Sequence, residues 1–435
     1  MNIWLIDHYT NMPQDLGDAR QFSNARELAK RGHTVRVIAC SFNHLTRNFY
    51  PSMEGGKRWD NRETHGVAFT VISATAYQTN FEMVRLRNML VFAFRTWLAE
   101  WAKDLPRPDI IMGSSPDPFV GIAAQRLASR YRVPFVLEIR DPWPYAISEV
   151  TGKSKYHPFV MVVDWTMRYL YAKASRIIML SKNSTDLLVE GGAKESKIVW
   201  IPQGVDLEMN PTPRPAPDDG LFTITYLGAH NQWNSLDTIL DAAKLLALWG
   251  VEHVLFRFVG DGVSKAGLIK RAVDEGIHNV RFDDPVPKMD VARVQHESDA
   301  FIINNRRDGV SKRWMSFNKL YDYLAAGRPV IFGSHTENDP VRESGAGISV
   351  EAGNAEALAK AVQHLAGLTR EELWQYGERG RRFIEKNYSI PALIDRFEVV
   401  ASEVTGIPCV TSRNAHAVDS HTQHAESLES VAQLR

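Results

Sequence analysis

The chain has 435 residues, more than one hydrophobic core normally holds, so we expect two domains. Its 51 Lys and Arg balance its 51 Asp and Glu, which excludes the broad basic field of a nucleic-acid-binding protein. The two cysteines, Cys40 and Cys409, lie far apart in the sequence. They form neither a disulfide framework nor a zinc site, which fits a reducing compartment.

The first residues, MNIWLID, have neither the basic start nor the long apolar core of a signal peptide, and they predict a buried strand. No apolar run approaches the roughly 20 residues of a membrane-spanning helix. We therefore expect a cytoplasmic protein, with peripheral contact to the inner membrane face left open.

Short apolar runs alternate with amphipathic stretches along residues 1–209. The apolar runs predict strands at 2–7, 34–39, 67–72, 109–113, 134–139, 176–180 and 197–201. Helical stretches separate most of these runs, and Gly32 stands where the first helix is expected to end. This alternation predicts a Rossmann-like domain, an α/β fold with a doubly wound parallel sheet covered on both faces.

Residues 210–219 carry four prolines and predict a linker. The alternation then restarts over 220–390, which predicts a second Rossmann-like domain. Its expected strands are 221–228, 254–260, 280–282, 299–303 and 329–333, and its expected helices lie near 235–249 and 263–275. Helices near 371–387 and 391–404 close the fold, with 391–404 expected to pack back on the first domain. Residues 405–435 predict a flexible polar tail, with metal binding by its three histidines as the alternative.

The most informative segment is residues 316–331, SFNKLYDYLAAGRPVI. Ser316 or Asn318 can cap a helix that ends at Gly327. The unpaired N–H groups at such a helix start suit a pyrophosphate, and Lys319 in the first turn makes sense beside an anion. Asp322, nearly one turn further, can accept hydrogen bonds from both hydroxyls of a ribose. The alternative is a surface helix with ordinary charges.

This segment resembles the nucleotide-binding motif of retaining GT-B glycosyltransferases of family four, in the subset that builds bacterial surface polysaccharides and reads SPNKLFDYMAAGKPVI. Further segments resemble family motifs in order and spacing. They are GHTVRVIA at 32–39, RVPFVLEIRDPWP at 132–144, IPQGVD at 201–206, FVGDG at 258–262 and VRFDDPVPKMDV at 280–291. The resemblance spans residues 1–404 and implies two Rossmann-like domains that face each other across a cleft.

The resemblance also implies roles for single residues. Asp322 should bind the donor ribose, while Lys319 and the backbone of Ser316, Phe317 and Asn318 should bind the pyrophosphate. Gly228 should let the backbone approach the phosphates. Asp261 and Gly262, with the loop from Phe282 to Pro285, should frame the nucleobase. Gly17 lies in the loop after the first strand, which in the family reaches the donor phosphates and the acceptor.

The sequence departs from the family pattern at three places. Trp314 stands where the family has the first glutamate of its E-x7-E motif, so the donor sugar is not predicted. The usual basic pair after the first strand of the second domain is missing. The segment GAHNQWNS offers His230 there, and Lys312 and Arg313 can supply positive charge or form a solvated loop.

The usual histidine–aspartate pair is replaced by Arg140 and Asp141, at the carboxyl end of a strand. We expect these two residues to position the reactants, although an ion pair that only holds the loop is the alternative. Asp117 follows another strand and either contacts the acceptor or forms a turn. Residues 83–103 predict either a basic amphipathic helix on an anionic membrane or a helix packed on the sheet.

The resemblance implies transfer with retention from a nucleotide-sugar, expected to be UDP-linked, to a lipid-linked saccharide. The departing diphosphate would be stabilised by Lys319 and the helix start, with no metal or other cofactor. A GT-B-fold UDP-sugar epimerase and a non-catalytic nucleotide- or glycan-binding scaffold are the alternatives. An NADP-dependent oxidoreductase is disfavoured because no G-x-G-x-x-G follows the first strand.

Overall fold

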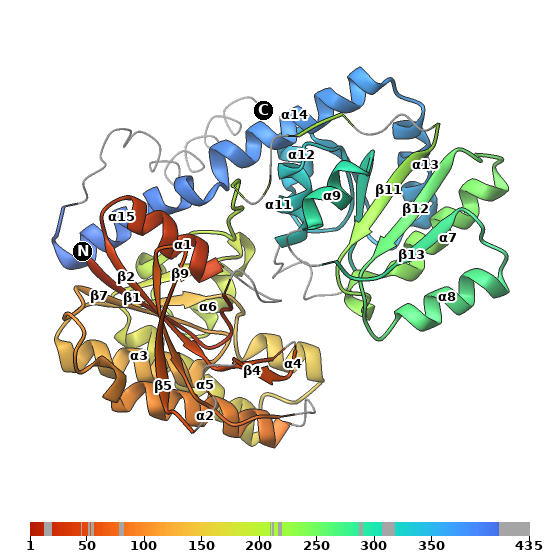
Figure 1. Cartoon of the computed structure of the whole chain (residues 1–435). Coiled ribbons are helices and arrows are strands. Elements are labelled where there is room, and N and C mark those ends of the chain that lie inside the picture. The colour runs from red at the N-terminus through yellow and green to blue at the C-terminus, as the bar shows by residue number, and fades with distance from the viewer. Residues whose placement is uncertain are drawn as a thin grey trace, which may run out of the picture.

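The computed structural model describes residues 1–12, 20–44, 46–50, 53, 56–77, 82–208, 210, 213–215, 220–286, 290–306 and 318–408. Two α/β domains lie side by side (Figure 1), each built on its own sheet. The prediction of two doubly wound domains is therefore confirmed.

The first domain has an eight-stranded sheet in the order β10-β9-β8-β7-β1-β2-β6-β5. Its strands are β1 (Asn2–Asp7), β2 (Thr34–Cys40), β5 (Trp59–Thr64), β6 (Val67–Ile72), β7 (Ile110–Ser114), β8 (Phe135–Ile139), β9 (Arg176–Met179) and β10 (Ile198–Trp200). All neighbours pair in parallel except β5 and β6, which are antiparallel. The short strands β3 (Phe42–Asn43) and β4 (Asn48–Phe49) form a separate antiparallel pair.

Alternation along β1 divides the core of this domain between the two faces of the sheet. Trp4 and Ile6 pack on one face, and Ile3 and Leu5 pack on the other. The helices of the domain are α1 (Arg20–Lys30), α2 (Glu82–Leu98), α3 (Pro118–Tyr131), α4 (Tyr145–Thr151), α5 (Pro158–Lys173) and α6 (Thr185–Glu190). Short 3₁₀ turns lie at Glu100–Ala102, Lys182–Ser184 and Glu195–Lys197. Helices α2, α3 and α5 cover the Trp4 face, and α1 covers the opposite face.

The second domain has a six-stranded, fully parallel sheet in the order β13-β12-β11-β14-β15-β16. Its strands are β11 (Phe222–Leu227), β12 (Val254–Val259), β13 (Val280–Asp283), β14 (Ala300–Asn304), β15 (Val330–Gly333) and β16 (Gly347–Val350). Its helices are α7 (Leu236–Leu248), α8 (Lys265–Asp274), α9 (Val291–His296), α11 (Asn318–Ala325), α12 (Pro340–Ser344), α13 (Ala355–Ala366) and α14 (Arg370–Asn387), with a 3₁₀ turn at Gln232–Asn234. The strands and helices predicted for this half are present to within a few residues, and β16 is an additional short edge strand.

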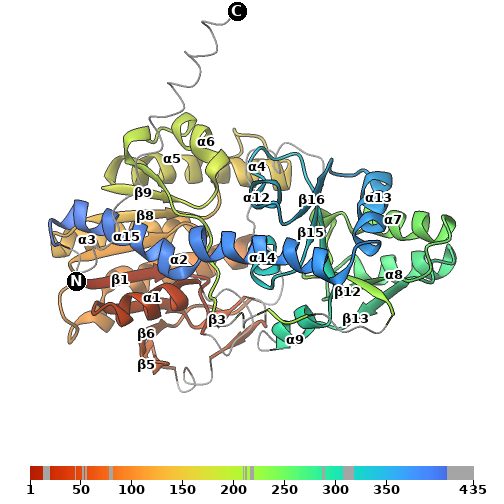
Figure 2. The same cartoon turned by 90° about the horizontal axis from the view of Figure 1, so that it is seen from above.

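The chain passes between the domains twice, and the two connecting stretches run side by side near Val205 and Ser389. Val205 and Ser389 form a parallel bridge, in which Val205 N–H donates to Tyr388 O at 2.8 Å and Ile390 N–H donates to Val205 O at 3.1 Å. Helix α15 (Ile390–Thr405) then returns to the first domain, as Figure 2 shows. Most of residues 209–219 and all of 409–435 lie outside the described residues, so the predicted linker and tail are not described further.

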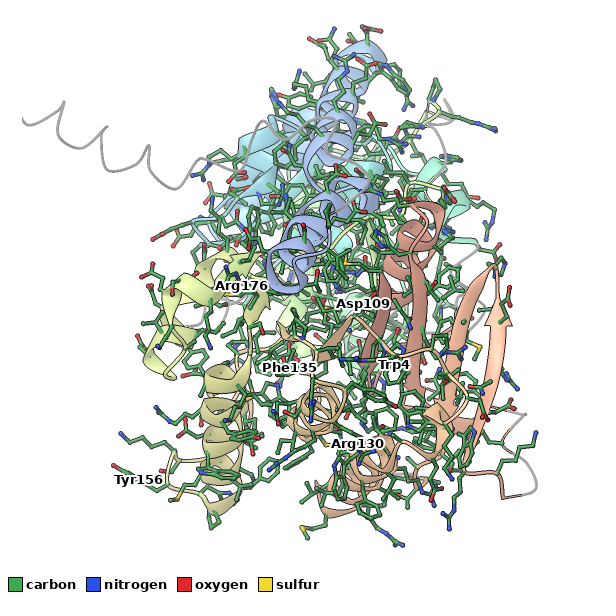
Figure 3. The ribbon with its side chains drawn as sticks, turned by 90° about the vertical axis from the view of Figure 1, so that its left-hand side faces the viewer. Trp4, Asp109, Arg130, Phe135, Tyr156 and Arg176 are labelled. Carbon is green, nitrogen blue, oxygen red and sulfur yellow. The ribbon has the colours of Figure 1, made fainter. Side chains whose placement is uncertain are left out.

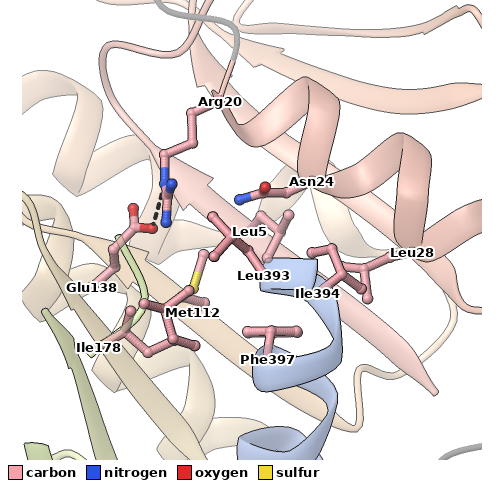
Figure 4. A pocket seen from close by; sticks show the side chains of 11 residues that line it. Leu5, Arg20, Asn24, Leu28, Met112, Glu138, Ile178, Leu393, Ile394 and Phe397 are labelled. Carbon is pink, nitrogen blue, oxygen red and sulfur yellow. Dashed lines mark hydrogen bonds and ion pairs between the residues drawn. The ribbon is translucent and has the colours of Figure 1, made fainter. Parts of the chain in front are cut away.

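Helix α15 completes the apolar layer beneath α1. Leu393 and Phe397 pack against Leu5 and Leu28 in one core, and Figure 4 shows these side chains converging between the helix and the sheet. Above them, Arg20 and Glu138 point toward each other as a buried ion pair, with Nε and Oε1 3.0 Å apart. The last helix is thus an integral part of the first domain.

The carboxyl ends of the two sheets face each other, and a hydrogen bond joins the loops that follow them. Asn183 follows β9 and donates from Nδ2 to Thr336 Oγ1, which follows β15, at 3.1 Å. Ligands of doubly wound sheets bind beyond the carboxyl ends of the strands, so both sets of strand ends can contribute to one site. Among the described helices, none is both long and apolar enough to cross a bilayer.

Candidate active site

The second-domain part of the site is built from backbone that packs too closely for any side chain. Gly228 follows β11 with φ of 152°, and Gly262 lies beyond β12 with φ of 155°. A Cβ atom on Gly228 would overlap the Lys319 side chain, and one on Gly262 would overlap the carbonyl of His230. Glycine is required at both positions by this close approach and by the backbone conformation. The loop after β11 therefore packs directly against α11, and the loop after β12 packs against the β11 loop.

Lys319 lies in the first turn of α11, with its amine directed at the β11 loop. Its Nζ donates to Tyr226 OH at 2.9 Å and to Asn234 Oδ1 at 3.1 Å. No carboxylate of the described residues pairs with this amine. Burial lowers the pKa of Lys319 to about 8. A buried cation without a counter-ion at a helix start is suited to hold an anion such as a pyrophosphate.

The other residues predicted to bind the donor lie near Lys319 or outside the described residues. Asn318 is exposed at the start of α11 and Asp322 is half-buried one turn along. Asp261 is exposed and accepts from the N–H of Gly262 at 2.8 Å. Ser316 and Phe317 are outside the described residues, as are Lys312, Arg313 and Trp314. The roles given to all of these residues stay predictions.

Aromatic rings form the wall beside these loops. Phe282 stacks on Phe258 with ring centroids 4.9 Å apart, and His230 lies edge-on to both. The His230 imidazole is fully buried, and neither ring nitrogen has a hydrogen-bond partner among the described residues. Burial and the nearby cations lower its pKa to about 4. His230 is thus a buried ring in this wall with a lowered pKa, and its role at the donor stays a prediction.

On the first domain, Arg140 and Asp141 follow the carboxyl end of β8. Arg140 Nη1 donates to Asp7 Oδ2 at 3.2 Å, and its backbone N–H donates to Ser115 Oγ at 3.1 Å. Asp141 is half-buried, and desolvation raises its pKa while the Arg140 charge opposes the rise. Three strand ends, those of β1, β7 and β8, thus meet at Arg140.

Asp117 does not reach outward as an acceptor-side residue. Its carboxylate is fully buried, caps α3 through the N–H of Phe119 at 2.9 Å, and lies 2.6 Å from His8 Nδ1. The alternative interpretation, a local structural aspartate, fits this geometry better than acceptor contact does. Gly17 lies outside the described residues.

His8 was not recognised in the sequence, yet it is the centre of a buried polar network. Its Nε2 lies 2.8 Å from Asn88 Oδ1, and Asn88 Nδ2 donates to Thr75 O, which leaves the oxygen for His8. Both ring nitrogens therefore face acceptors, as a doubly protonated imidazolium requires. Burial alone would lower the pKa of His8, but its neighbours Cys40 and Tyr9 and the hydrogen bond with Asp117 raise it well above its ordinary value.

Glu138 is a second buried group that the sequence did not single out. It accepts from Arg20 Nε at 3.0 Å, from Gln21 Nε2 at 2.8 Å and from Ser114 Oγ at 2.7 Å. Arg20 also donates to Pro202 O at 2.9 Å, at the start of the segment that leads to the second domain. This network ties the start of α1 to the interdomain connection.

No group of three or more His, Cys, Asp or Glu side chains within the described residues is arranged to hold a metal ion. The expectation that the reaction needs no metal or other cofactor stays a prediction.

Two family models match the chain, one in each half. The model described as Glycosyltransferase Family 4 matches residues 22–209, and the model described as Glycosyl transferases group 1 matches residues 222–367. With the two Rossmann-like domains, these matches show that the chain is a glycosyltransferase with the GT-B fold, whose first half is similar to family four.

Individual relatives agree with this assignment. The chain is 24% identical over 382 residues to the putative colanic acid biosynthesis glycosyl transferase WcaI of Escherichia coli (strain K12), covering 81% of this chain and 89% of WcaI. It superposes on Anabaena Alr3699/HepE in complex with UDP and glucose with a TM-score of 0.64, at 13% identity, over 93% of this chain and 100% of that one. It superposes on WaaG, a glycosyltransferase involved in lipopolysaccharide biosynthesis, with a TM-score of 0.63, at 15% identity, over 93% and 100% of the two chains. At these identities, the structural likeness shows a shared fold.

Proposed function

We propose that the enzyme transfers a hexose-type sugar, N-acetylated or deoxy, from a UDP-linked donor to a lipid-linked saccharide, with retention, during surface-polysaccharide synthesis. The observation that carries the proposal is the buried Lys319 amine at the start of α11, which has no carboxylate partner among the described residues. A nucleoside diphosphate at this position would supply the missing negative charge.

The donor part of the proposal has further support. Anabaena HepE, which shares the fold, has been seen with UDP and glucose. In the present chain, Asp322 would bind the ribose and the backbone at Gly228 would approach the phosphates. The Phe282 and Asp261 loops would frame the uracil.

In the reaction, the bond between the anomeric carbon and the β-phosphate oxygen breaks while the acceptor oxygen bonds to that carbon. The acceptor's proton passes to the departing phosphate oxygen on the same face of the sugar. Lys319 and the α11 start stabilise the developing negative charge. Arg140 and Asp141 position the reactants from the first domain, and closure of the domains excludes water.

We also propose that the first domain contacts an anionic membrane through α2 and α5. Helix α2 buries Phe92 and Met89 against the sheet, so the alternative of a helix packed on the sheet holds for that side. Its other side exposes Met83 (68%), Leu90 (45%) and Phe94 (55%). These three side chains line a groove that also contains Arg58 and Arg87.

The exposed apolar surface continues on α5, at the same outer layer of the domain. Trp165 is 66% exposed and Met161 and Val162 are also exposed. Helices α5, α3 and α2 lie side by side beneath the sheet in Figure 3, with Tyr156 at the outer end of the layer. Apolar and aromatic side chains beside arginines are typical of a surface that inserts shallowly into an anionic bilayer.

A thermal-shift panel with UDP, GDP, ADP and CMP tests the donor assignment. A ligand that binds only the folded state raises the melting temperature by mass action. We expect UDP to stabilise the protein, and we expect Asp322→Ala and Lys319→Ala to lose that effect. Lys270→Ala is the matched control, because Lys270 is an exposed α8 lysine paired with Asp274. No stabilisation of folded protein by any nucleotide would favour the scaffold interpretation.

Vesicle co-sedimentation tests the membrane contact separately. We expect binding to vesicles of anionic phospholipid, weak binding to zwitterionic vesicles, and loss of binding in the double variant Phe94→Ser and Trp165→Ser. Val263→Ser, which alters a 93% exposed apolar residue on the second domain, is the control. Equal binding by the double variant and the wild type would contradict this part of the proposal.

A further inference from the structure

Arg85 lies beside the first-domain part of the active site and makes no ion pair with any described residue. Its Nε and Nη2 donate to a single phenol oxygen, Tyr9 OH, at 3.2 and 3.1 Å. The guanidinium also lies over the Tyr9 ring, 5.4 Å from its centroid. An arginine that is partly buried with only a phenol as partner retains most of its capacity to bind an oxyanion.

Carboxylates do lie near Arg85, but each is already engaged. Asp117 holds His8 and caps α3. Asp7 accepts from Arg140 and from the N–H of Tyr9, the latter at 2.9 Å. Asp141 is half-buried beside Arg140, and its pKa is raised by desolvation. The arrangement of these groups thus leaves the Arg85 charge available.

A further cation, Arg47, and a neutral ring, His44, lie in the surroundings of Arg85. Arg47 lies over the ring of Tyr77, with its guanidinium carbon 4.9 Å from the centroid. His44 lies edge-on to Tyr9, with ring centroids 5.3 Å apart. Burial and the cations Arg85, Arg47 and His8 lower the pKa of His44 to about 4. The Tyr9 hydroxyl accepts from Arg85 and donates to no described atom, so it has a proton to offer.

We propose that Arg85 and Tyr9 bind an oxyanion carried by the acceptor, a phosphate or a carboxylate, next to Arg140 and Asp141. This inference rests on the proposed function, because it places the acceptor on the first domain while the nucleotide occupies the second. Arg85 supplies the charge and a planar set of donors, and Tyr9 supplies one more hydrogen bond. A neutral acceptor would leave the Arg85 charge uncompensated and would bind less well.

The test is isothermal titration of UDP-saturated protein with inorganic pyrophosphate and, separately, with a hexuronate. Saturating UDP occupies the donor site, so a second anion reports on another site. We expect the wild type to bind one of the two probes, which distinguishes phosphate from carboxylate as the acceptor's group. We expect Arg85→Gln to weaken that binding about tenfold or more, as the loss of charge-assisted hydrogen bonds predicts, with Arg85→Lys intermediate and Tyr9→Phe modestly weaker.

Arg130→Gln is the matched control, because Arg130 is an exposed arginine at the end of α3, and it should bind the probe like the wild type. Retained UDP affinity in Arg85→Gln shows that the variant is folded. If UDP-saturated wild type binds neither probe, or Arg85→Gln binds the probe like the wild type, the inference is wrong. If Arg85→Gln loses UDP itself while Arg85→Lys retains it, Arg85 serves the donor phosphates and the acceptor assignment is wrong. Failure of UDP to bind any variant would instead refute the proposed function.

Discussion

Replacing Lys319 with methionine should stabilise the protein without nucleotide and abolish nucleotide binding. The pKa of Lys319 falls from its ordinary value of 10.5 to about 8 on folding because the amine is buried. That difference corresponds to roughly 3 kcal/mol of stability lost at neutral pH. Methionine keeps the apolar stem but loses the hydrogen bonds to Tyr226 and Asn234, worth about 1 kcal/mol each. The expected net gain for Lys319→Met is therefore about 1 kcal/mol at pH 7.

The gain should depend on pH with a definite sign. A lysine whose pKa is lowered on folding destabilises the folded state fully below about pH 8, and this penalty disappears as the pH rises toward 10.5. The advantage of Lys319→Met should therefore shrink between pH 7 and about pH 9.5, and urea unfolding at both values measures it. A variant that is markedly less stable than the wild type at pH 7, or that still gains stability from UDP, would refute the reasoning.

Three further predictions follow from the same geometry. Gly228→Ala should lower UDP affinity at least tenfold and destabilise the protein by about 1–3 kcal/mol, because the new Cβ displaces Lys319. Gly267→Ala in α8, where a Cβ meets no atom, should do neither. Calorimetry measures the affinity and urea unfolding measures the stability. Arg140→Ala should move the acidic limb of the pH–rate profile to higher pH, because the Arg140 charge holds down the pKa of Asp141; an unmoved limb would separate Asp141 from catalysis. His8→Gln should lower the free energy of unfolding by about 3 kcal/mol near pH 6, measured with urea, and by less near pH 9. A histidine whose pKa is raised on folding stabilises the folded state at pH values below the pKa of the unfolded chain, and this stabilisation is lost as the pH rises through the pKa of the folded state. An equal loss at both pH values would contradict a charged His8.

The rule that ligands of doubly wound sheets bind beyond the carboxyl ends of the strands predicted much of the candidate site from sequence. Arg140, Gly228 and Lys319 were all placed by their position after a strand or at a helix start, and the structure brings each to the carboxyl edge of its sheet. The rule did not extend to His8, although His8 directly follows β1. Its partners, Asn88 and Asp117, lie 80 and 109 residues further along the chain, and no local pattern links them.

Other differences have equally specific causes. Arg85 lies within residues 83–103, for which the sequence left a membrane helix and a helix packed on the sheet as alternatives, because α2 is apolar on more than one side and its periodicity does not separate the faces. In the structure, Arg85 donates to Tyr9 OH, Arg95 donates to Ser73 O at 2.9 Å, and Arg87 is exposed. Strand β5 was missed because its sequence, WDNRET, is polar and half-exposed at a sheet edge, where one covered face suffices.

The most direct test of the central claim is to follow turnover of a UDP-hexose by proton NMR in the presence of lipid-linked saccharide acceptors. The account predicts release of UDP with a product whose anomeric configuration matches that of the donor, and loss of turnover in Lys319→Ala but not in Lys270→Ala. A product of inverted configuration, or bound UDP with no sugar transferred from any UDP-hexose by the wild type, would contradict it.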